Sequence, residues 1–92
     1  MSISEALGVL ENKHCIAIML ALIDGPRTKM ELYGDVSKNP RMPEKIEDLE
    51  RIGLVTTWTV DRRATMVSLT DKGERVAGML SEIDGMLDPK VL

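Results

Sequence analysis

Two short clusters of polar and basic side chains are the groups in this sequence best suited to chemistry with a partner. The first contains Lys38, Asn39 and Arg41, and the second is the adjacent pair Arg62 and Arg63. Ammonium and guanidinium groups neutralise phosphate, while asparagine and arginine side chains match the hydrogen-bonding edges of adenine and guanine. Both clusters are therefore candidate contacts to DNA, provided that the surrounding elements bring them to one surface.

The charge of the chain is unevenly distributed. From Arg27 to Arg63 there are eight basic and seven acidic residues, a net charge of +1, whereas the remainder holds four basic and eight acidic residues, a net charge of −4. The total of −3 argues against indiscriminate nucleic-acid binding. The part of the chain expected to face DNA is nevertheless the positively charged part, as DNA binding requires.

A helix-turn-helix pattern surrounds the first cluster, over about residues 29–52. The run Thr28-Lys29-Met30-Glu31 has the spacing of a capping box and predicts a helix over 29–37. A proline-rich connector follows, and Pro43 marks the start of the next helix, because its missing amide breaks no helical bond at the first position. The polar connector between two helices is typical of a helix-turn-helix.

A β-hairpin follows and carries the second cluster at its tip. Residues 54–60 and 65–69 are rich in β-branched side chains and predict two strands, with a minimal third strand expected near Thr28. Trp58 lies within the first strand and could stack on a base. A single tryptophan in a small hairpin more often packs against its own domain, so packing is the favoured interpretation.

The remaining helices supply the core. A helix starting near Ile3, a buried helix over 13–23 and a final helix over 71–87 are expected from their capping residues and apolar spacing. The last helix has a broad apolar face for one short domain, so it either packs fully on the core or pairs with another chain. We expect dimerisation through the first and last helices. These two helices supply the candidate dimer interface of Leu7, Leu10, Val76, Met79, Leu80, Ile83, Met86 and Leu87.

The composition favours one domain over residues 1–92 and gives no support to catalysis. The chain is 43% hydrophobic, lacks Phe and has seven Met, which together predict an aliphatic core. Its single His and single Cys, His14 and Cys15, cannot complete a metal shell, so we expect no metal, cofactor or catalytic residue. A packed histidine and a buried thiol are expected, with a redox-sensing Cys15 as the open alternative.

The sequence also predicts a cytoplasmic protein. It has no secretory signal and no apolar run near the roughly 18 residues that a membrane span requires. A lone cysteine is consistent with a reducing compartment. No small-molecule effector can be deduced from one chain.

The order of elements predicts an α+β, mainly α, winged helix-turn-helix, in which helices pack on a small antiparallel β-hairpin wing over 54–69. The run Ala6-Leu7-Gly8-Val9-Leu10 and the later run from Leu49-Glu50-Arg51-Ile52-Gly53-Leu54-Val55 to Ser68-Leu69-Thr70-Asp71-Lys72-Gly73 resemble HxlR-type winged-helix transcription regulators. They are also similar to the broader MarR type. The resemblance covers about residues 5–85, although His14 stands where the family usually has Trp and the wing is short.

The resemblance implies a dimeric transcription regulator that places the second helix of the motif, 43–52, in the major groove and the wing beside the minor groove. The partner is then double-stranded DNA. The candidate DNA-binding residues are Lys29, Lys38, Asn39, Arg41, Lys45, Arg62 and Arg63.

The second helix of the motif is acidic for that task. Glu44, Glu47 and Asp48 accompany Lys45, which we expect on its outward face. Carboxylates in a groove repel phosphate. This observation supports an alternative, in which the domain is a winged-helix module for protein–protein contact without sequence-specific DNA binding.

Overall fold

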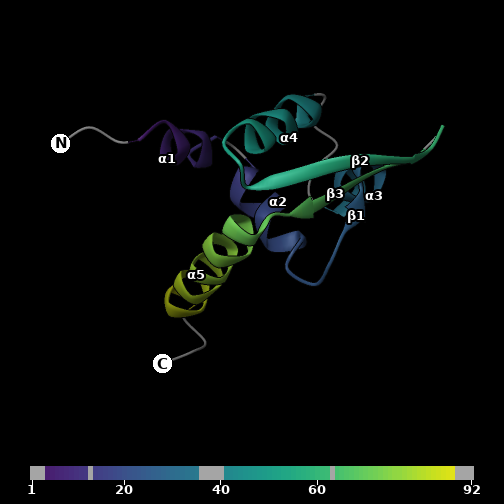
Figure 1. The fold of residues 1–92 in the computed structure, drawn as a ribbon. Coiled ribbons are helices and arrows are strands. Elements are labelled where there is room, and N and C mark those ends of the chain that lie inside the picture. The colour runs from purple at the N-terminus through teal and green to yellow at the C-terminus, as the bar shows by residue number, and fades with distance from the viewer. Residues whose placement is uncertain (1–3, 13, 36–40, 63, 89–92) are drawn as a thin grey trace.

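The computed structural model describes residues 4–12, 14–35, 41–62 and 64–88, and its elements follow the predicted order (Figure 1). Along the chain these are α1 (Glu5–Leu10), α2 (Cys15–Ala21), β1 (Arg27–Thr28), α3 (Lys29–Asp35), α4 (Met42–Arg51), β2 (Val55–Asp61), β3 (Ala64–Leu69) and α5 (Asp71–Leu87). The fold is mainly helical with one small antiparallel sheet, as the sequence predicts.

The three strands form one sheet in the order β1-β3-β2. In the hairpin, Val55 is paired with Leu69 and Thr57 with Val67. Strand β1 adds two residues to the other edge of β3, where Arg27 is paired with Val67. The minimal strand expected near Thr28 is thus present, and the Arg27 guanidinium connects it to α2 by donating to the carbonyl oxygen of Ala21 at 2.8 Å.

The core is aliphatic, as the composition predicts. Its fully buried side chains come from α2, α3, α4 and both hairpin strands, among them Ile18, Leu32, Ile46, Leu49 and Val67. Helix α2 lies at the centre and packs against α1, α3, α4 and α5. This central packing fixes the positions of the two helices of the predicted helix-turn-helix.

A compact joint connects the end of α4, the hairpin and the start of α5. Gly53 ends the helical segment with a φ of 82°, in the left-handed region that favours glycine. The Thr70 hydroxyl donates to the Gly53 carbonyl oxygen at 2.6 Å and accepts from the Gly73 amide at 3.0 Å. A Cβ at Gly73 would lie 1.9 Å from the Leu54 carbonyl oxygen, so only glycine fits there. Gly53, Thr70 and Gly73 therefore serve to hold this joint together.

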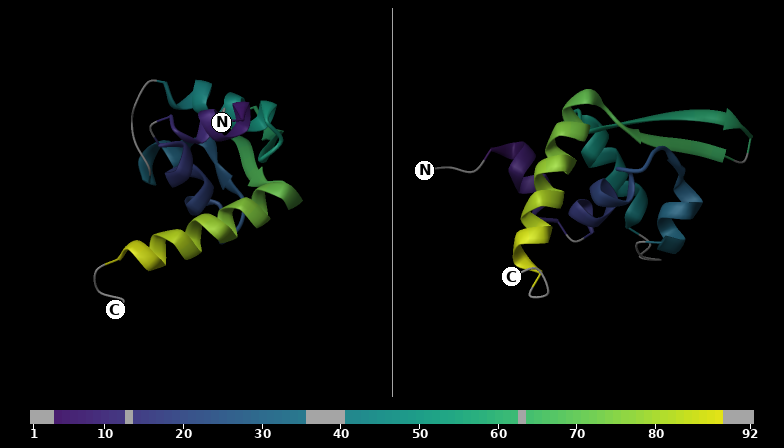
Figure 2. Two further views of the ribbon diagram at one scale, coloured as in Figure 1. Left: turned by 90° about the vertical axis from the view of Figure 1, so that its left-hand side faces the viewer. Right: turned by 90° about the horizontal axis from the view of Figure 1, so that it is seen from below.

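Helix α5 is the longest described helix, at 17 residues, and its far end extends away from the rest of the molecule (Figure 2). Its first half is packed on the core through Gly73 and Ala77, which are buried. Its second half exposes large apolar side chains. None of the described helices is long and apolar enough to cross a membrane.

Several local predictions need correction. Helix α1 is capped by the Ser4 hydroxyl, which accepts from the Leu7 amide, so the helix begins two residues later than expected. Helix α2 begins only at Cys15, because His14 has a left-handed φ of 72°. Helix α4 begins at Met42, one residue before Pro43. Proline is tolerated there because the first helical amides have no intrahelical acceptor.

Candidate nucleic-acid interface

The first helix of the motif, the start of the second and the wing lie toward the same side of the molecule (Figure 1). Helix α3 begins at Lys29, Arg41 is the N-cap of α4, and Arg62 lies at the tip of the hairpin. Helix α1 and the last turns of α5 lie on the opposite side. Basic residues from three separate elements therefore share one side, as the motif requires.

Three of the other predicted contacts lie outside the described residues. These are Lys38, Asn39 and Arg63. Arg41 and Arg62, their neighbours, are both exposed. At the wing, the Asp61 carboxylate accepts the Ala64 amide at 3.0 Å and so closes the turn that presents Arg62.

The acidic character of α4 is partly structural. The Glu50 carboxylate accepts from both the amide and the hydroxyl of Thr57, at 3.1 and 2.9 Å, and so fastens the helix to the wing. Asp48 lies 3.5 Å from the Arg51 guanidinium. Only Glu44 and Glu47 remain as exposed carboxylates of α4 without an ion pair or hydrogen bond to another described residue.

Arg51 is also engaged by α1. Its guanidinium donates to the Glu5 carboxylate as well as contacting Asp48. The hydrogen bond to Glu5 and the charge of that carboxylate raise the pKa of Arg51 above its ordinary value. Arg51 therefore links α1 to the end of α4, and it is not a free cation for DNA.

Lys45 is expected on the outward face of α4, but it does not lie at the centre of that face. It is half-buried, and its charge acts on the thiol of Cys15 in α2. Lys45 thus occupies the flank of α4 that faces the N-terminal helices. A contact to DNA from this position requires the side chain to extend along the helix surface.

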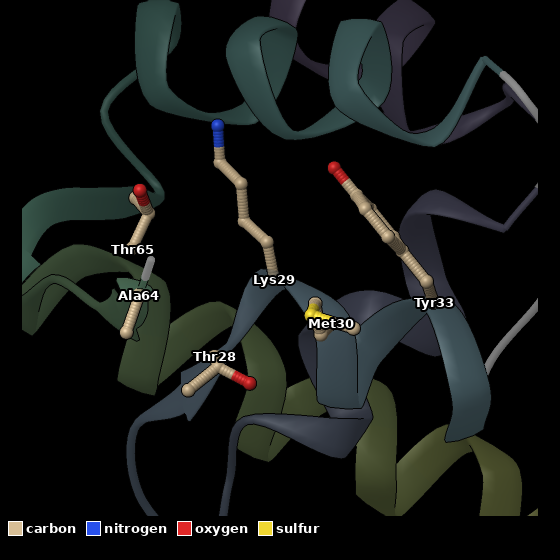
Figure 3. Close-up of a pocket in the computed structure, with 6 residues that line it drawn as sticks. All are labelled: Thr28, Lys29, Met30, Tyr33, Ala64 and Thr65. Carbon is tan, nitrogen blue, oxygen red and sulfur yellow. The ribbon is translucent and has the colours of Figure 1, made fainter. Parts of the chain in front are cut away.

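Lys29 lies in a pocket between α3 and the wing (Figure 3). The pocket has a volume of about 290 Å³ and is lined by Thr28, Lys29, Met30, Tyr33, Ala64 and Thr65. Lys29 and Tyr33 are four residues apart on α3, a spacing that places both on one helix face. The sequence indicated Lys29 alone. Thr65 joins it only through the folding of the hairpin.

The capping box predicted at the start of α3 is confirmed. The Thr28 hydroxyl accepts from the Glu31 amide and the Glu31 carboxylate accepts from the Thr28 amide, both at 3.0 Å. The hydrogen bond from the Thr28 backbone lowers the pKa of Glu31 below its ordinary value, with smaller contributions from the Thr28 side chain and the charge of Arg27. Both side chains thus serve to position the helix.

Trp58 is exposed, whereas the favoured interpretation of the sequence packs it against its own domain. It lies opposite Met66 on the hairpin, and its side chain is 43% exposed, with Val60 beyond it at 60%. The reason is the strand alternation, because Val55 and Thr57 on the other face are the residues that turn toward the core and α4. The outer face of the wing is therefore partly apolar.

Cys15 is packed in the core, in agreement with the buried thiol that the sequence predicts. It is fully buried, and burial raises the pKa of its thiol despite the opposing charge of Lys45. A raised pKa disfavours the reactive thiolate. His14 is only partly buried and begins the turn into α2.

The candidate dimer residues divide into two groups. Leu10, Val76 and Leu80 are partly buried against the core of their own chain. The remaining five are exposed: Leu7, Met79, Ile83, Met86 and Leu87. Met86 and Leu87 are 81% and 76% exposed, so the end of α5 exposes large apolar side chains to solvent.

The fold is similar to that of solved transcriptional regulators. A transcriptional regulator homologue from Pyrococcus horikoshii OT3 is 26% identical, with a TM-score of 0.70 over 97% of this chain and 100% of that chain. The transcriptional regulator YodB from B. subtilis, in its reduced form, is 21% identical, with a TM-score of 0.73 over 96% and 93% of the two chains.

A third similar structure is the adhesin competence repressor AdcR from Streptococcus pyogenes. It is 20% identical, with a TM-score of 0.70 over 87% of this chain and 65% of that chain. No family model matches the sequence, and no match is found among curated proteins. The element order, the three-stranded sheet and these likenesses agree, and the chain has the winged helix-turn-helix fold of solved transcriptional regulators.

Proposed function

We propose that the protein is a cytoplasmic, dimeric transcription regulator that inserts α4 into the major groove of DNA and contacts the backbone with its wing. The observation that carries this proposal is that the start of α3, the start of α4 and the wing tip lie toward one side of a winged helix-turn-helix (Figure 1). These segments carry Lys29, Arg41 and Arg62. Lys38, Asn39 and Arg63 adjoin these residues in the sequence. Phosphate contacts from several elements supply affinity and register, whereas base contacts supply specificity.

The second half of α5 supports the dimer. Met79, Ile83, Met86 and Leu87 are all more than half exposed, and an apolar stripe of this kind is typical of a helix that has a partner. A second copy that brings its own α5 would cover these side chains. Two-fold symmetry would then present two copies of α4 to successive half-sites of the duplex.

The direct test is the double variant Arg62→Ala with Arg63→Ala. Duplexes are first selected from a random library with the wild-type protein, and binding is then measured over a range of salt concentrations. We expect weaker binding to every duplex sequence and a salt slope smaller by about 2, since each phosphate contact contributes about 1.

A single Arg75→Ala variant is the matched control, because Arg75 is exposed on α5, outside the basic side of the molecule. It removes one basic side chain, as each substitution in the wing pair does. Unchanged affinity in the wing variant would remove the wing from the mechanism.

Glu44 and Glu47 favour a second candidate function, a module that binds protein instead of DNA. Both are exposed on α4, where they would approach phosphate if the helix entered a groove. The two functions differ in their response to salt and to duplex. A protein-binding module would show no duplex binding even at low salt, and that result would refute the regulator.

A further inference from the structure

We propose that Lys29, Tyr33 and Thr65 form a binding site for one phosphate group of the DNA backbone, in the pocket between α3 and β3. The inference rests on the proposed function and adds to it two residues, Tyr33 and Thr65, and a defined ligand. A phosphate held here would contact the first helix of the motif and the wing at once. It would thereby fix the register of the domain on the duplex.

The pocket has the size and composition for an oxyanion. Its volume of about 290 Å³ lies at the small end of the range of ligand sites, which suits a phosphate group better than a large organic molecule. None of its six lining residues is acidic, although the whole chain has a net charge of −3. The nearest acid in sequence, Glu31, does not line the pocket, and its carboxylate accepts the Thr28 amide.

The polar ends of the three residues are available as donors. Lys29 and Tyr33 extend from α3 in the same direction, and the Thr65 hydroxyl turns to that side from the wing (Figure 3). Within the described part of the chain, none of these three side chains has a hydrogen-bond partner. The Thr28 hydroxyl differs, because it turns away and caps α3. An ammonium and two hydroxyls offer donors to the several oxygens of one phosphate.

The state of Tyr33 is consistent with this role. Partial burial raises the pKa of its hydroxyl above the ordinary value, so the group keeps its proton at neutral pH and remains a donor. The ring also packs against the core, which restricts where the hydroxyl points. A donor held in place loses less conformational freedom when it binds.

The location selects the backbone of DNA as the source of the phosphate. The pocket is lined by residues of α3 and the wing, and α3, the wing tip and the start of α4 lie toward the same side of the molecule (Figure 1). A duplex engaged by α4 would therefore run close to these residues. A free phosphate ion would meet the same three donors but no other contacts. We therefore expect free inorganic phosphate to bind far more weakly than a duplex.

The test combines protein variants with a duplex selected by the wild-type protein. Each backbone phosphate is replaced in turn by a neutral methylphosphonate, and affinities are measured at one salt concentration. For the wild-type protein we expect one position in each half-site where the replacement lowers affinity ~10-fold. The variants Tyr33→Phe and Thr65→Val should each bind the unmodified duplex ~3- to 10-fold more weakly. In these variants, the methylphosphonate at the sensitive position should lower the affinity for the duplex only slightly further.

Thr56→Val is the matched control, because Thr56 lies on β2 with its side chain exposed on the face opposite Thr57. It should bind as the wild type does. Wild-type affinity in both Tyr33→Phe and Thr65→Val would overturn the site. The site would also be overturned if the loss of affinity from each variant added fully to the loss from the methylphosphonate at every position of the duplex. In both cases salt-dependent duplex binding by the wild type would leave the proposed function intact, whereas a wild type that binds no duplex at low salt would refute both.

A second measurement separates the two sources of phosphate. Inorganic phosphate is titrated into the protein while NMR signals of residues 29, 33 and 65 are followed. We expect small shifts that do not saturate at millimolar concentration. Saturation at lower concentration, without a sensitive position in the duplex, would show a site for the free ion and contradict the proposal.

Discussion

Helices α4 and α5 differ in how far their apolar side chains are buried. In α4 the apolar residues Met42, Ile46 and Leu49 are buried in their own domain, and the outward face is charged. In α5 the apolar stripe continues past the core, and Met86 at its end is 81% exposed. The difference is that α4 leaves none of its large apolar side chains strongly exposed, whereas α5 exposes several. One helix is therefore suited to a polar ligand such as DNA and the other to a second copy of the chain.

The joint between the two helices should give the largest effect on stability. Gly73→Ala places a methyl group 1.9 Å from the Leu54 carbonyl oxygen, a clash that only backbone movement relieves. We expect a loss of at least about 3 kcal/mol in the free energy of unfolding, measured by chemical denaturation.

Gly78→Ala is the matched control for this clash, since a Cβ there meets nothing within 4 Å. It should stabilise α5 by about 0.5–1 kcal/mol, because alanine favours a helix over glycine. Equal effects of the two substitutions would contradict the packing described at the joint.

The apolar end of α5 should determine the oligomeric state. Met79→Gln or Met86→Gln removes apolar area that the dimer would bury, and full burial of such a side chain is worth about 1.5–3 kcal/mol. We expect each variant to shift the protein toward monomer in sedimentation. Glu82→Gln, an exposed residue of the same helix, should leave the dimer unchanged. A wild-type protein that sediments as a monomer would refute the dimer itself.

The acidic face of α4 should have a smaller and opposite effect on DNA binding. Glu44→Gln and Glu47→Gln each remove a carboxylate that would face phosphate, and we expect each to strengthen duplex binding by about 0.5–1 kcal/mol at low salt. The gain should diminish at high salt. Weaker binding in either variant would show instead that the carboxylate accepts a hydrogen bond from a base, as glutamate can from cytosine.

The smallest expected effect is the pH dependence at the start of α3. The pKa of Glu31 is lowered in the folded protein, so the stability it contributes is present above its ordinary value of 4.5 and is lost as the pH falls through the lowered value. In Glu31→Gln this pH-dependent part should be absent. Denaturation curves of the two proteins between pH 7 and acid pH measure the difference, and a constant difference at all pH values would contradict it.

Features that depend on neighbouring residues could be predicted from the sequence. The capping box of Thr28 and Glu31 and the limits of α5 follow from local chemistry, and the structure confirms them. The short strand at Arg27–Thr28 is present as expected, but it forms by pairing with the distant β3. The start of α1 at Glu5 was missed because Ser2 and Ser4 both offer a capping hydroxyl, and the structure caps the helix with Ser4.

Features that depend on tertiary contact could not be predicted. Lys45 is on the flank of α4 because of how that helix lies on α2, and Trp58 is exposed because the opposite face of β2 faces the core. The pocket that brings Tyr33 near Thr65 joins two segments distant in the sequence. A pattern within one segment carries no information on such a pairing.

The salt dependence of duplex binding by the wild-type protein tests the central claim most directly. Affinity for a selected duplex is measured by fluorescence anisotropy between low and physiological salt. If α4, α3 and the wing contact several phosphates, the logarithm of the association constant should fall steeply and linearly with the logarithm of salt concentration, by about 0.9 per phosphate neutralised. No binding at low salt, or binding that does not change with salt, would contradict DNA recognition by this winged helix.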